Sequence, residues 1–396
     1  MASQATVEEV IVNPWKVEGK LTNEVYNRLI QEFGVNPLTS ELLDRFRRLT
    51  GIKKLHSLLE RGMCFAHRGF KDILDDYEKG KPIFLYTGRG PTSDALHLGH
   101  IIPMEFTAWL QKVFDAIVVF QMADDEKYWF KDMDFDTIYK LGRINARDVI
   151  SLGFNPDKTF IFSNRDFSRE PSYQKVAFDI LNNVNINTIQ AIFGIPDSGR
   201  AGQLIWPVYQ STAAFSQAFE RIFGNKSVKC LVVYAIDQDP YFRMARDVAT
   251  KFGFEKPCAL MCQFLPSLEG TAKMSSTGNN GVVKTIFMTD TPKDIKDKIN
   301  KYAFSGGQET TELHRKLGGN PDVDISYQWL KYFMDNDDEL KGIAEEYRSG
   351  RMLTGELKKI TIDTISKIVA SHQQKRAQVT DKIVDQFYDI EKFKKM

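Results

Sequence analysis

The strongest constraint on the fold is an alternation, starting after Pro82, between short unbroken apolar segments and segments of helical periodicity. The apolar segments, rich in β-branched and aromatic residues, are 83–86, 116–122, 159–163, 229–236 and 258–264. Unbroken apolar strands separated by helices are typical of a parallel sheet that is covered on both faces. We therefore predict an α/β fold with a Rossmann-like sheet, in which ligands bind beyond the carboxyl ends of the strands.

The chain on either side of this region has a different character. Before it, a strand or hairpin near residues 7–15 is followed by charged amphipathic helices at about 23–32 and 40–48. After about residue 287 the strand signal ends, and the pattern becomes helical and rich in Lys and Glu. We predict an N-terminal extension (1–77), a Rossmann-like domain (78–287) with an insertion at about 166–226, and a helical C-terminal domain (288–396).

Composition restricts the class of protein. Lys and Arg number 53 against 52 Asp and Glu, so the net charge is only +1 and a nucleic-acid partner must meet a local basic face. The four cysteines fit a reduced protein, and Cys258 and Cys262 lack the second pair that would complete a zinc site. The N-terminus lacks the pattern of a targeting signal, and the most apolar runs are too short to span a bilayer. We expect a cytoplasmic protein without a membrane segment.

A glycine-rich loop follows the first apolar segment: Tyr86-Thr87-Gly88-Arg89-Gly90-Pro91 leads to His97-Leu98-Gly99-His100, where a helix begins. Glycines let the backbone approach a ligand closely, and a helix N-terminus favours an anionic phosphate. His97 and His100 lie on one face of the first helical turn. Their imidazoles can donate hydrogen bonds to a phosphate whose negative charge grows during transfer. The sequence therefore predicts a phosphate site here.

Other sites for this segment fit less well. A dinucleotide-binding loop needs Gly where Ser93 stands, and the Gly-x-x-x-x-Gly-Lys-Ser/Thr phosphate loop does not occur in the chain. A metal site on His97 and His100 lacks further ligands nearby in the sequence. Phosphate binding is the interpretation that uses the strand, the glycines and the helix start together.

A second candidate is segment 271–281, which holds Lys273 among several hydroxyl residues and glycines. Its composition predicts a mobile loop. A flexible cationic loop can close over phosphates and stabilise a departing anion. Taken alone, the segment has the composition of ordinary solvated surface.

We predict no metal site in the protein itself. The acidic stretch 132–136 begins like a calcium loop, but Thr137 takes the glycine position and Arg143 the closing glutamate position. Asp124 and Asp125 have no partner carboxylates or histidines placed to complete a two-metal centre. For these two we expect helix-capping or structural roles.

The two phosphate motifs together resemble the signatures of the class I aminoacyl-tRNA synthetases. His97-Leu98-Gly99-His100 is similar to the first signature and Lys273-Met274-Ser275-Ser276-Thr277 to the second. The second motif departs from the usual Lys-Met-Ser-Lys-Ser, because Ser276 replaces the second lysine and Thr277 the last serine. Lys273 must therefore carry more of the cationic role.

The whole chain, from about Val10 to near its end, resembles the cytosolic eukaryotic type of tryptophanyl-tRNA synthetase. The matching stretches are 85–91, 121–127, 235–244, 303–307 and 352–359. The resemblance implies a ligase of protein biosynthesis that activates tryptophan with ATP and transfers it to the 3′ end of tRNA(Trp). It also implies Mg²⁺ that accompanies ATP, a homodimer formed through the insertion, and anticodon binding by the C-terminal domain.

The resemblance also implies roles for individual residues. Tyr86 and Gln121 would contact the indole nitrogen, and Glu126, Gln210 and Gln238 would surround the amino-acid backbone end of tryptophan. The residues expected at ATP are Thr87, Gly88, Arg89, Gly90, His97, Gly99, His100, Lys273, Met274 and Ser275. Of these, we assign catalytic roles to His97 and His100 at the phosphates and to Lys273 and Ser275 at the leaving pyrophosphate.

Two other functions stay open at this point. The related tyrosine–tRNA ligases are predicted instead if Tyr86 and Gln121 surround a phenol. A non-catalytic RNA-binding or signalling relative is a further alternative. The intact His97, His100 and Lys273 speak against it, since a binding module has no need of residues that stabilise phosphates.

Overall fold

The computed structural model describes residues 10–14, 17–270, 274 and 284–395. The chain divides into two compact units. One, the sheet unit, comprises Ile30–Ala95, Pro103–Gln263 and Lys375–Met396. The other, the helical unit, comprises Met1–Leu29, Leu96–Ile102 and Phe264–Gln374. Each is described by itself.

The sheet unit is built on a seven-stranded sheet with the order β3-β4-β9-β8-β5-β6-β7. The strands are β3 (Asn36–Pro37), β4 (Cys64–Arg68), β5 (Ile83–Arg89), β6 (Ile117–Met122), β7 (Thr159–Ser163), β8 (Lys229–Ala235) and β9 (Cys258–Cys262). The last five are mutually parallel and coincide with the apolar segments of the sequence. The predicted α/β, Rossmann-like fold is confirmed.

The order of the parallel strands fixes where a ligand crevice belongs. The parallel part of the sheet starts with β5. From there the chain runs outward through β6 and β7 and then returns to β8, on the other side of β5. The strand order therefore reverses between β5 and β8. In open α/β sheets, ligands bind at such a switch point, outside the carboxyl ends of the strands. Residues that follow β5, β6 and β8 are therefore placed to contact a ligand in that crevice.

Two antiparallel strands extend the sheet at one edge. β4 pairs with β9 in antiparallel register, from Cys64↔Cys262 to Arg68↔Ala259, and β3 pairs with β4. The sequence analysis did not anticipate these strands. β3 is only two residues long and contains Pro37, which is tolerated because it lies in an edge strand.

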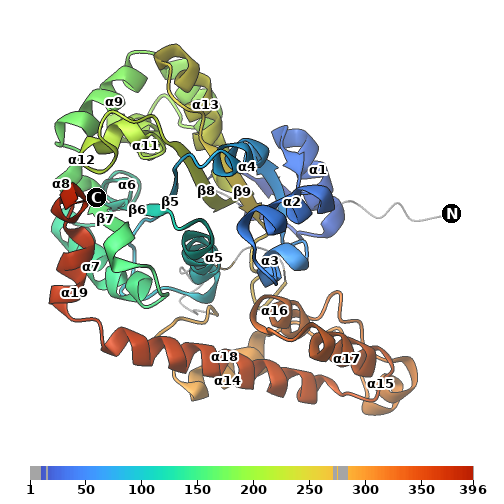
Figure 1. Ribbon diagram of the computed structural model, residues 1–396. Helices are drawn as coiled ribbons and strands as arrows, with labels where there is room; N and C mark the ends of the chain where they lie inside the picture. Colours follow the sequence, from blue (N-terminus) through green and yellow to red (C-terminus); the bar gives the residue numbers. More distant parts are fainter. Residues whose placement is uncertain (1–9, 15–16, 271–273, 275–283, 396) are drawn as a thin grey trace. The chain divides into compact units, whose positions relative to one another are not determined.

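Helices connect the strands of this unit and cover the sheet (Figure 1). They are α2 (Ser40–Thr50), α3 (Ser57–Glu60), α4 (Phe70–Glu78), α5 (Leu98–Phe114, its first turn counted with the helical unit), α6 (Asp124–Phe130), α7 (Phe135–Ile150), η1 (Pro156–Lys158), α8 (Asn164–Phe167), α9 (Pro171–Leu181), α10 (Ile186–Phe193), α11 (Ala201–Thr212), η2 (Ser216–Phe219), α12 (Glu220–Phe223), η3 (Ile236–Gln238), α13 (Asp239–Phe252), α19 (Asp381–Tyr388) and η4 (Glu391–Lys395). Helix α11 packs against both α9 and α13, drawn in green to olive in Figure 1.

The helical unit contains a short antiparallel pair and a group of helices. Its elements are β1 (Ile11–Val12), β2 (Val17–Glu18), α1 (Asn23–Phe33, which ends in the sheet unit), α14 (Pro292–Tyr302), α15 (Thr311–Leu317), α16 (Ile325–Phe333), α17 (Asp337–Arg348) and α18 (Thr354–Ala377, whose last turn belongs to the sheet unit). Leu330, Tyr347 and Leu357 form its buried core, and the Tyr347 hydroxyl donates to Asp324 over 2.9 Å. The glycines at 318 and 319 end α15, where Gly318 adopts a φ of 73°. Within the described residues, no helix combines the length and apolarity needed to cross a membrane.

Candidate active site

Tyr86 and Gln121, the two residues predicted at the ring of the substrate, are in direct contact on the neighbouring strands β5 and β6. The Tyr86 hydroxyl donates a hydrogen bond of 2.5 Å to Gln121 Oε1, and the backbone oxygen of Gln210 lies 3.2 Å from the same hydroxyl. Both side chains are buried. Burial raises the pKa of the Tyr86 phenol well above its ordinary value, so the hydroxyl keeps its proton.

The amide nitrogen of Gln121 donates away from Tyr86. Nε2 lies 2.9 Å from Asn164 Oδ1 and 3.3 Å from the Tyr173 hydroxyl, and Asn164 Nδ2 in turn donates to Asp125 Oδ1 over 2.9 Å. Sequence reasoning missed Asn164 and Tyr173. Asn164 directly follows strand β7, so its position after a parallel strand was an available signal, whereas Tyr173 lies within α9 and carried none.

The two predicted glutamines also meet. Gln210 lies on α11 and Gln238 in η3, and Gln210 Nε2 donates to Gln238 Oε1 over 3.2 Å. Glu126 lies on α6, where its carboxylate pairs with Lys127 Nζ at 2.7 Å. A methyl group placed on Gly90 would lie 2.3 Å from Glu126 Oε2, so Glu126 stands against the glycine-rich loop. Hydrogen bonds therefore link Tyr86, Gln121, Gln210 and Gln238, while Glu126 adjoins the loop expected to bind ATP.

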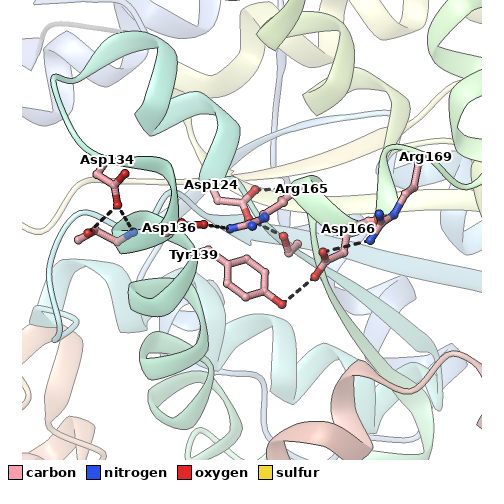
Figure 2. Close-up of polar contacts among 9 residues, drawn as sticks. Asp124, Asp134, Asp136, Tyr139, Arg165, Asp166 and Arg169 are labelled. Atoms are coloured by element: carbon pink, nitrogen blue, oxygen red, sulfur yellow. Dashed lines mark hydrogen bonds and ion pairs between the residues drawn. The ribbon is translucent and has the colours of Figure 1, made fainter.

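The acidic residues near α6 and α7 are engaged with the protein (Figure 2). Asp124 accepts from the Ser163 hydroxyl and from the backbone N–H of Arg165, and its own carboxylate also caps the Asp125 N–H at 3.1 Å. Asp134 caps α7 through Thr137, and Asp136 pairs with Arg165 at 2.6 Å. These bonds give Asp124 a structural role, one of the two roles expected for it, and the carboxylates of the 132–136 stretch that Figure 2 draws have separate partners.

The end of β5 needs glycine at position 88 because the neighbouring strand β6 is close. A methyl group on Gly88 would lie 2.9 Å from the backbone oxygen of Gln121. The Ala123 N–H donates to the backbone oxygen of Arg89 over 2.8 Å, and Asn145 on α7 donates to that of Ser93 over 2.8 Å. The loop backbone is thus held by two elements at the carboxyl end of the sheet, where a nucleotide can approach it.

Arg89 brings a buried positive charge to this loop. Burial lowers the pKa of its guanidinium to about 10, and the carboxylates of Glu126 and Asp148 oppose that shift. Asp148 is fully buried on α7. At neutral pH the guanidinium keeps its charge, which suits an anionic ligand such as a phosphate.

The helical unit contains the histidine pair. The rings of His97 and His100 are stacked, with centroids 3.4 Å apart and an interplanar angle of 22°. The segment is fixed by backbone hydrogen bonds from Leu98 N to Ile286 O (3.2 Å) and from Met288 N to Leu96 O (2.8 Å). The two imidazoles are therefore adjacent, as their spacing predicted.

The second motif is described at one residue. Lys273 and Ser275, like Ser276 and Thr277, lie outside the described residues. Met274 is buried, and its Cβ lies 3.6 Å from the position that a Cβ on Gly99 would take. The residue between Lys273 and Ser275 therefore lies beside the histidine motif.

Known proteins are similar to this chain in sequence and in fold. The family model for class I tRNA synthetases of tryptophan and tyrosine (W and Y) matches residues 78–370. The cytoplasmic tryptophan–tRNA ligase of Oryctolagus cuniculus is 46% identical over 384 residues, which covers 96% of this chain and 80% of the relative. That of Saccharomyces cerevisiae is 45% identical over 390 residues, covering 96% of this chain and 89% of the relative.

A solved structure agrees with this likeness. The crystal structure of Plasmodium falciparum tryptophanyl-tRNA synthetase superposes with a TM-score of 0.86 at 41% sequence identity, covering 93% of this chain and 97% of that one. The match extends over both the sheet and the C-terminal helices, because nearly the whole chain is covered. The chain belongs to the class I tRNA synthetases for tryptophan and tyrosine, and within them it is similar to the cytoplasmic tryptophan enzymes of eukaryotes.

Proposed function

We propose that this chain is a tryptophan–tRNA ligase that acts in the cytoplasm. It activates tryptophan with ATP and then transfers the amino acid to the 3′ end of tRNA(Trp). The observation that carries the proposal is the buried Tyr86–Gln121 pair at 2.5 Å, which offers oxygen acceptors to a ring N–H. The likeness to ligases that are named for tryptophan supports the same substrate. No comparison favours tyrosine over tryptophan.

The first step joins tryptophan to AMP. An oxygen of the tryptophan carboxylate attacks the α-phosphorus of ATP, the bond from that phosphorus to the bridging oxygen breaks, and pyrophosphate leaves with the electron pair. No protein nucleophile takes part. The acceleration comes from positioning the two reactants and from stabilising charge on the phosphates.

We assign His97 and His100 to the phosphates during this step. Gly88 and Gly90 admit the nucleotide to the loop backbone, since a side chain at either position would meet Gln121, Glu126 or Lys127. Lys273 and Ser275 take the departing pyrophosphate in this proposal. Met274 beside Gly99 supports a meeting of the two motifs. The remaining ATP contacts are proposed for Thr87, Arg89, Gly99 and Met274.

The second step uses the same tryptophan-binding residues. The 2′-hydroxyl of the terminal ribose attacks the tryptophanyl carbonyl, and AMP leaves. In both steps Tyr86 and Gln121 hold the indole, and Glu126, Gln210 and Gln238 surround the ammonium and carboxylate end. Glu126 supplies the negative charge that an ammonium needs, and the two glutamines supply neutral polar groups.

Mg²⁺ accompanies ATP in this proposal. Across the part of the chain that the structure describes, no group of three or more His, Cys, Asp or Glu side chains is gathered as a metal cage. Mg²⁺ usually keeps several waters and binds through substrate phosphates, so this residue set fits a metal brought by the nucleotide. The ion would neutralise phosphate charge.

We also propose a homodimer, formed through the insertion at about 166–226. Three large hydrophobic side chains on α9 and α10 support it: Phe178 is 57% exposed, Leu181 38% and Ile186 60%. Exposed apolar side chains on adjacent helices are typical of protein interfaces. The division of the chain at 77/78 and 287/288, and anticodon binding by the helices after 288, remain parts of the same proposal.

The test is ATP–pyrophosphate exchange with each of the twenty amino acids. Exchange with tryptophan alone is the expected result. Exchange with tyrosine and not with tryptophan would show that tyrosine is the substrate. Exchange with no amino acid, in the absence of tRNA, would favour the non-catalytic relative considered from the sequence.

A further inference from the structure

A chain of side-chain hydrogen bonds runs behind the proposed ring site, and it begins at Asp125. Asp125 Oδ1 accepts from the backbone N–H of Glu126 over 2.8 Å and from Asn164 Nδ2 over 2.9 Å. A backbone N–H can only donate, so Oδ1 is an acceptor whether or not the other carboxyl oxygen carries a proton. Asp125 therefore requires Asn164 to present its NH₂ group.

This requirement sets the direction of the later bonds in the chain. With its NH₂ toward Asp125, Asn164 turns Oδ1 toward Gln121, which presents Nε2 at 2.9 Å. The Tyr209 backbone oxygen, at a longer 3.4 Å from Nε2, favours the same orientation. Gln121 Oε1 consequently faces the Tyr86 hydroxyl, which donates to it over 2.5 Å. The other neighbour of this proton, the Gln210 backbone oxygen at 3.2 Å, is also an acceptor, so the Tyr86 oxygen is left with lone pairs for a ligand donor.

Burial favours a single direction for each hydrogen bond in this chain of side chains. Tyr86, Gln121, Asn164 and Asp125 are between 1% and 5% exposed, so water is excluded from rescuing a misdirected amide. A flipped Gln121 would aim Nε2 at the Tyr86 oxygen and compete with a ligand N–H for its lone pairs. Leaving a buried polar group unpaired is costly, and this cost favours one orientation of the Gln121 amide.

We propose that Asp125 and Asn164 are positioning residues that set substrate selectivity, because together they orient Gln121 so that Tyr86 accepts a hydrogen bond from the ring N–H. The proposal rests on the proposed function, since it takes Tyr86 and Gln121 as the ring site. It adds that the polarity of the pocket is decided two side chains away from the ligand. We call the hydrogen bonds that run from Asp125 through Asn164 and Gln121 to Tyr86 the relay. Asp125 accepts its hydrogen bonds whether its carboxyl group is neutral or charged, so the relay does not depend on that charge.

The experiment compares tryptophan with its benzothiophene isostere, in which sulfur replaces the ring N–H. The ratio of kcat/KM for tryptophan to kcat/KM for the isostere, measured by pyrophosphate exchange, reports how strongly the ring site selects for the N–H. Asp125→Leu and Asn164→Leu each break the relay and should lower this ratio about tenfold or more, because the favoured orientation is lost. The KM for ATP should stay within about twofold of wild type.

Two further variants separate the relay from general packing. Asp125→Asn keeps an acceptor oxygen for Asn164 and for the Glu126 N–H, so it should retain the wild-type ratio. Ser163→Ala removes the neighbouring buried hydrogen bond to Asp124, which does not lead to Gln121, and it should also retain the ratio. Thermal melting of each variant shows that it is folded.

Several results would overturn the relay. These are a wild-type ratio in folded Asp125→Leu or Asn164→Leu, an equal loss in Asp125→Asn, or an equal loss in Ser163→Ala. Failure of both leucine variants to fold would also count against it, because the two side chains would then act through stability. Failure of the wild-type protein to exchange with tryptophan would instead contradict the proposed function.

Discussion

The Tyr86 hydroxyl donates a hydrogen bond of 2.5 Å to the side-chain oxygen of Gln121. The two residues are 35 positions apart in the sequence, yet parallel pairing of β5 with β6 sets them side by side. A hydroxyl whose proton is committed in this way offers its oxygen to a ligand donor. In the proposed function this pair recognises the indole N–H of tryptophan.

Tyr86→Phe removes the hydroxyl and keeps the ring that packs against Phe242. An indole N–H left unpaired in a buried site costs about 1–3 kcal/mol, so the KM for tryptophan should rise about tenfold or more. The KM for ATP should change little, because the hydroxyl has no part at the phosphates. Steady-state pyrophosphate exchange measures both constants. Equal rises in the two would show that Tyr86 supports the whole site rather than the ring.

Lys273→Ala tests the cationic role that the sequence gives to this residue. Adenylate formation should fall strongly, about a hundredfold, because the lysine would stabilise the departing pyrophosphate. Tryptophan affinity, measured by calorimetry without ATP, should stay close to wild type. Lys284→Ala is a suitable control, since Lys284 follows the same segment and forms an ion pair with Glu269. Equal losses of rate and of tryptophan affinity would refute the assignment of Lys273.

Arg376→Gln should destabilise the sheet unit. Arg376 pairs at 2.6 Å with Asp148, whose side chain is 0% exposed, so the substitution removes a charged partner from a buried carboxylate. We expect a loss of about 2–4 kcal/mol in the free energy of unfolding. Arg147→Gln is the matched control, because its partner Asp381 is 81% exposed and the loss should be under about 1 kcal/mol. Urea unfolding measures both losses. Equal losses of unfolding free energy in the two variants would contradict this account.

Lys392 should give the protein a distinct dependence of stability on pH. Burial lowers the pKa of its ammonium from 10.5 to about 8, although Nζ donates to the backbone oxygens of Thr159 and Gln386. Between these two pKa values the unfolded chain binds more protons than the folded one, so the stability contribution rises as pH increases from about 8 to 10.5. Lys392→Gln should lose this increment. The measurement is the free energy of unfolding of the wild type and of Lys392→Gln as a function of pH. The same change with pH in both proteins would contradict the role given to Lys392.

The parallel part of the fold was predictable because its signal is local. Each of β5 to β9 is a short apolar run, and burial on both faces leaves no polar alternation to confuse it. The antiparallel strands β3 and β4 were not predicted. The β4 segment, Cys64–Arg68, mixes apolar and charged residues and so lacks the unbroken apolar pattern of the parallel strands. β4 pairs with β9, which lies nearly two hundred residues away, and long-range pairing leaves no local trace.

The site was predictable where residues follow strands or belong to a motif. His97 and His100 are adjacent as their spacing predicted, Gln121 lies near the end of β6, and Gln238 lies in η3, directly after β8. The relay through Asn164 was not foreseen, because its meaning depends on which side chains face each other across β6 and β7. A sequence identifies candidate side chains but does not orient an amide.

Aminoacylation with purified tRNA is the most direct test of the central claim. The protein is offered tRNA(Trp) and tRNA(Tyr), each with radiolabelled tryptophan or tyrosine in the presence of ATP and Mg²⁺. The account predicts that label accumulates only with tryptophan on tRNA(Trp). Tyrosine transferred to tRNA(Tyr), or no acylation of either tRNA by a folded protein, would contradict it.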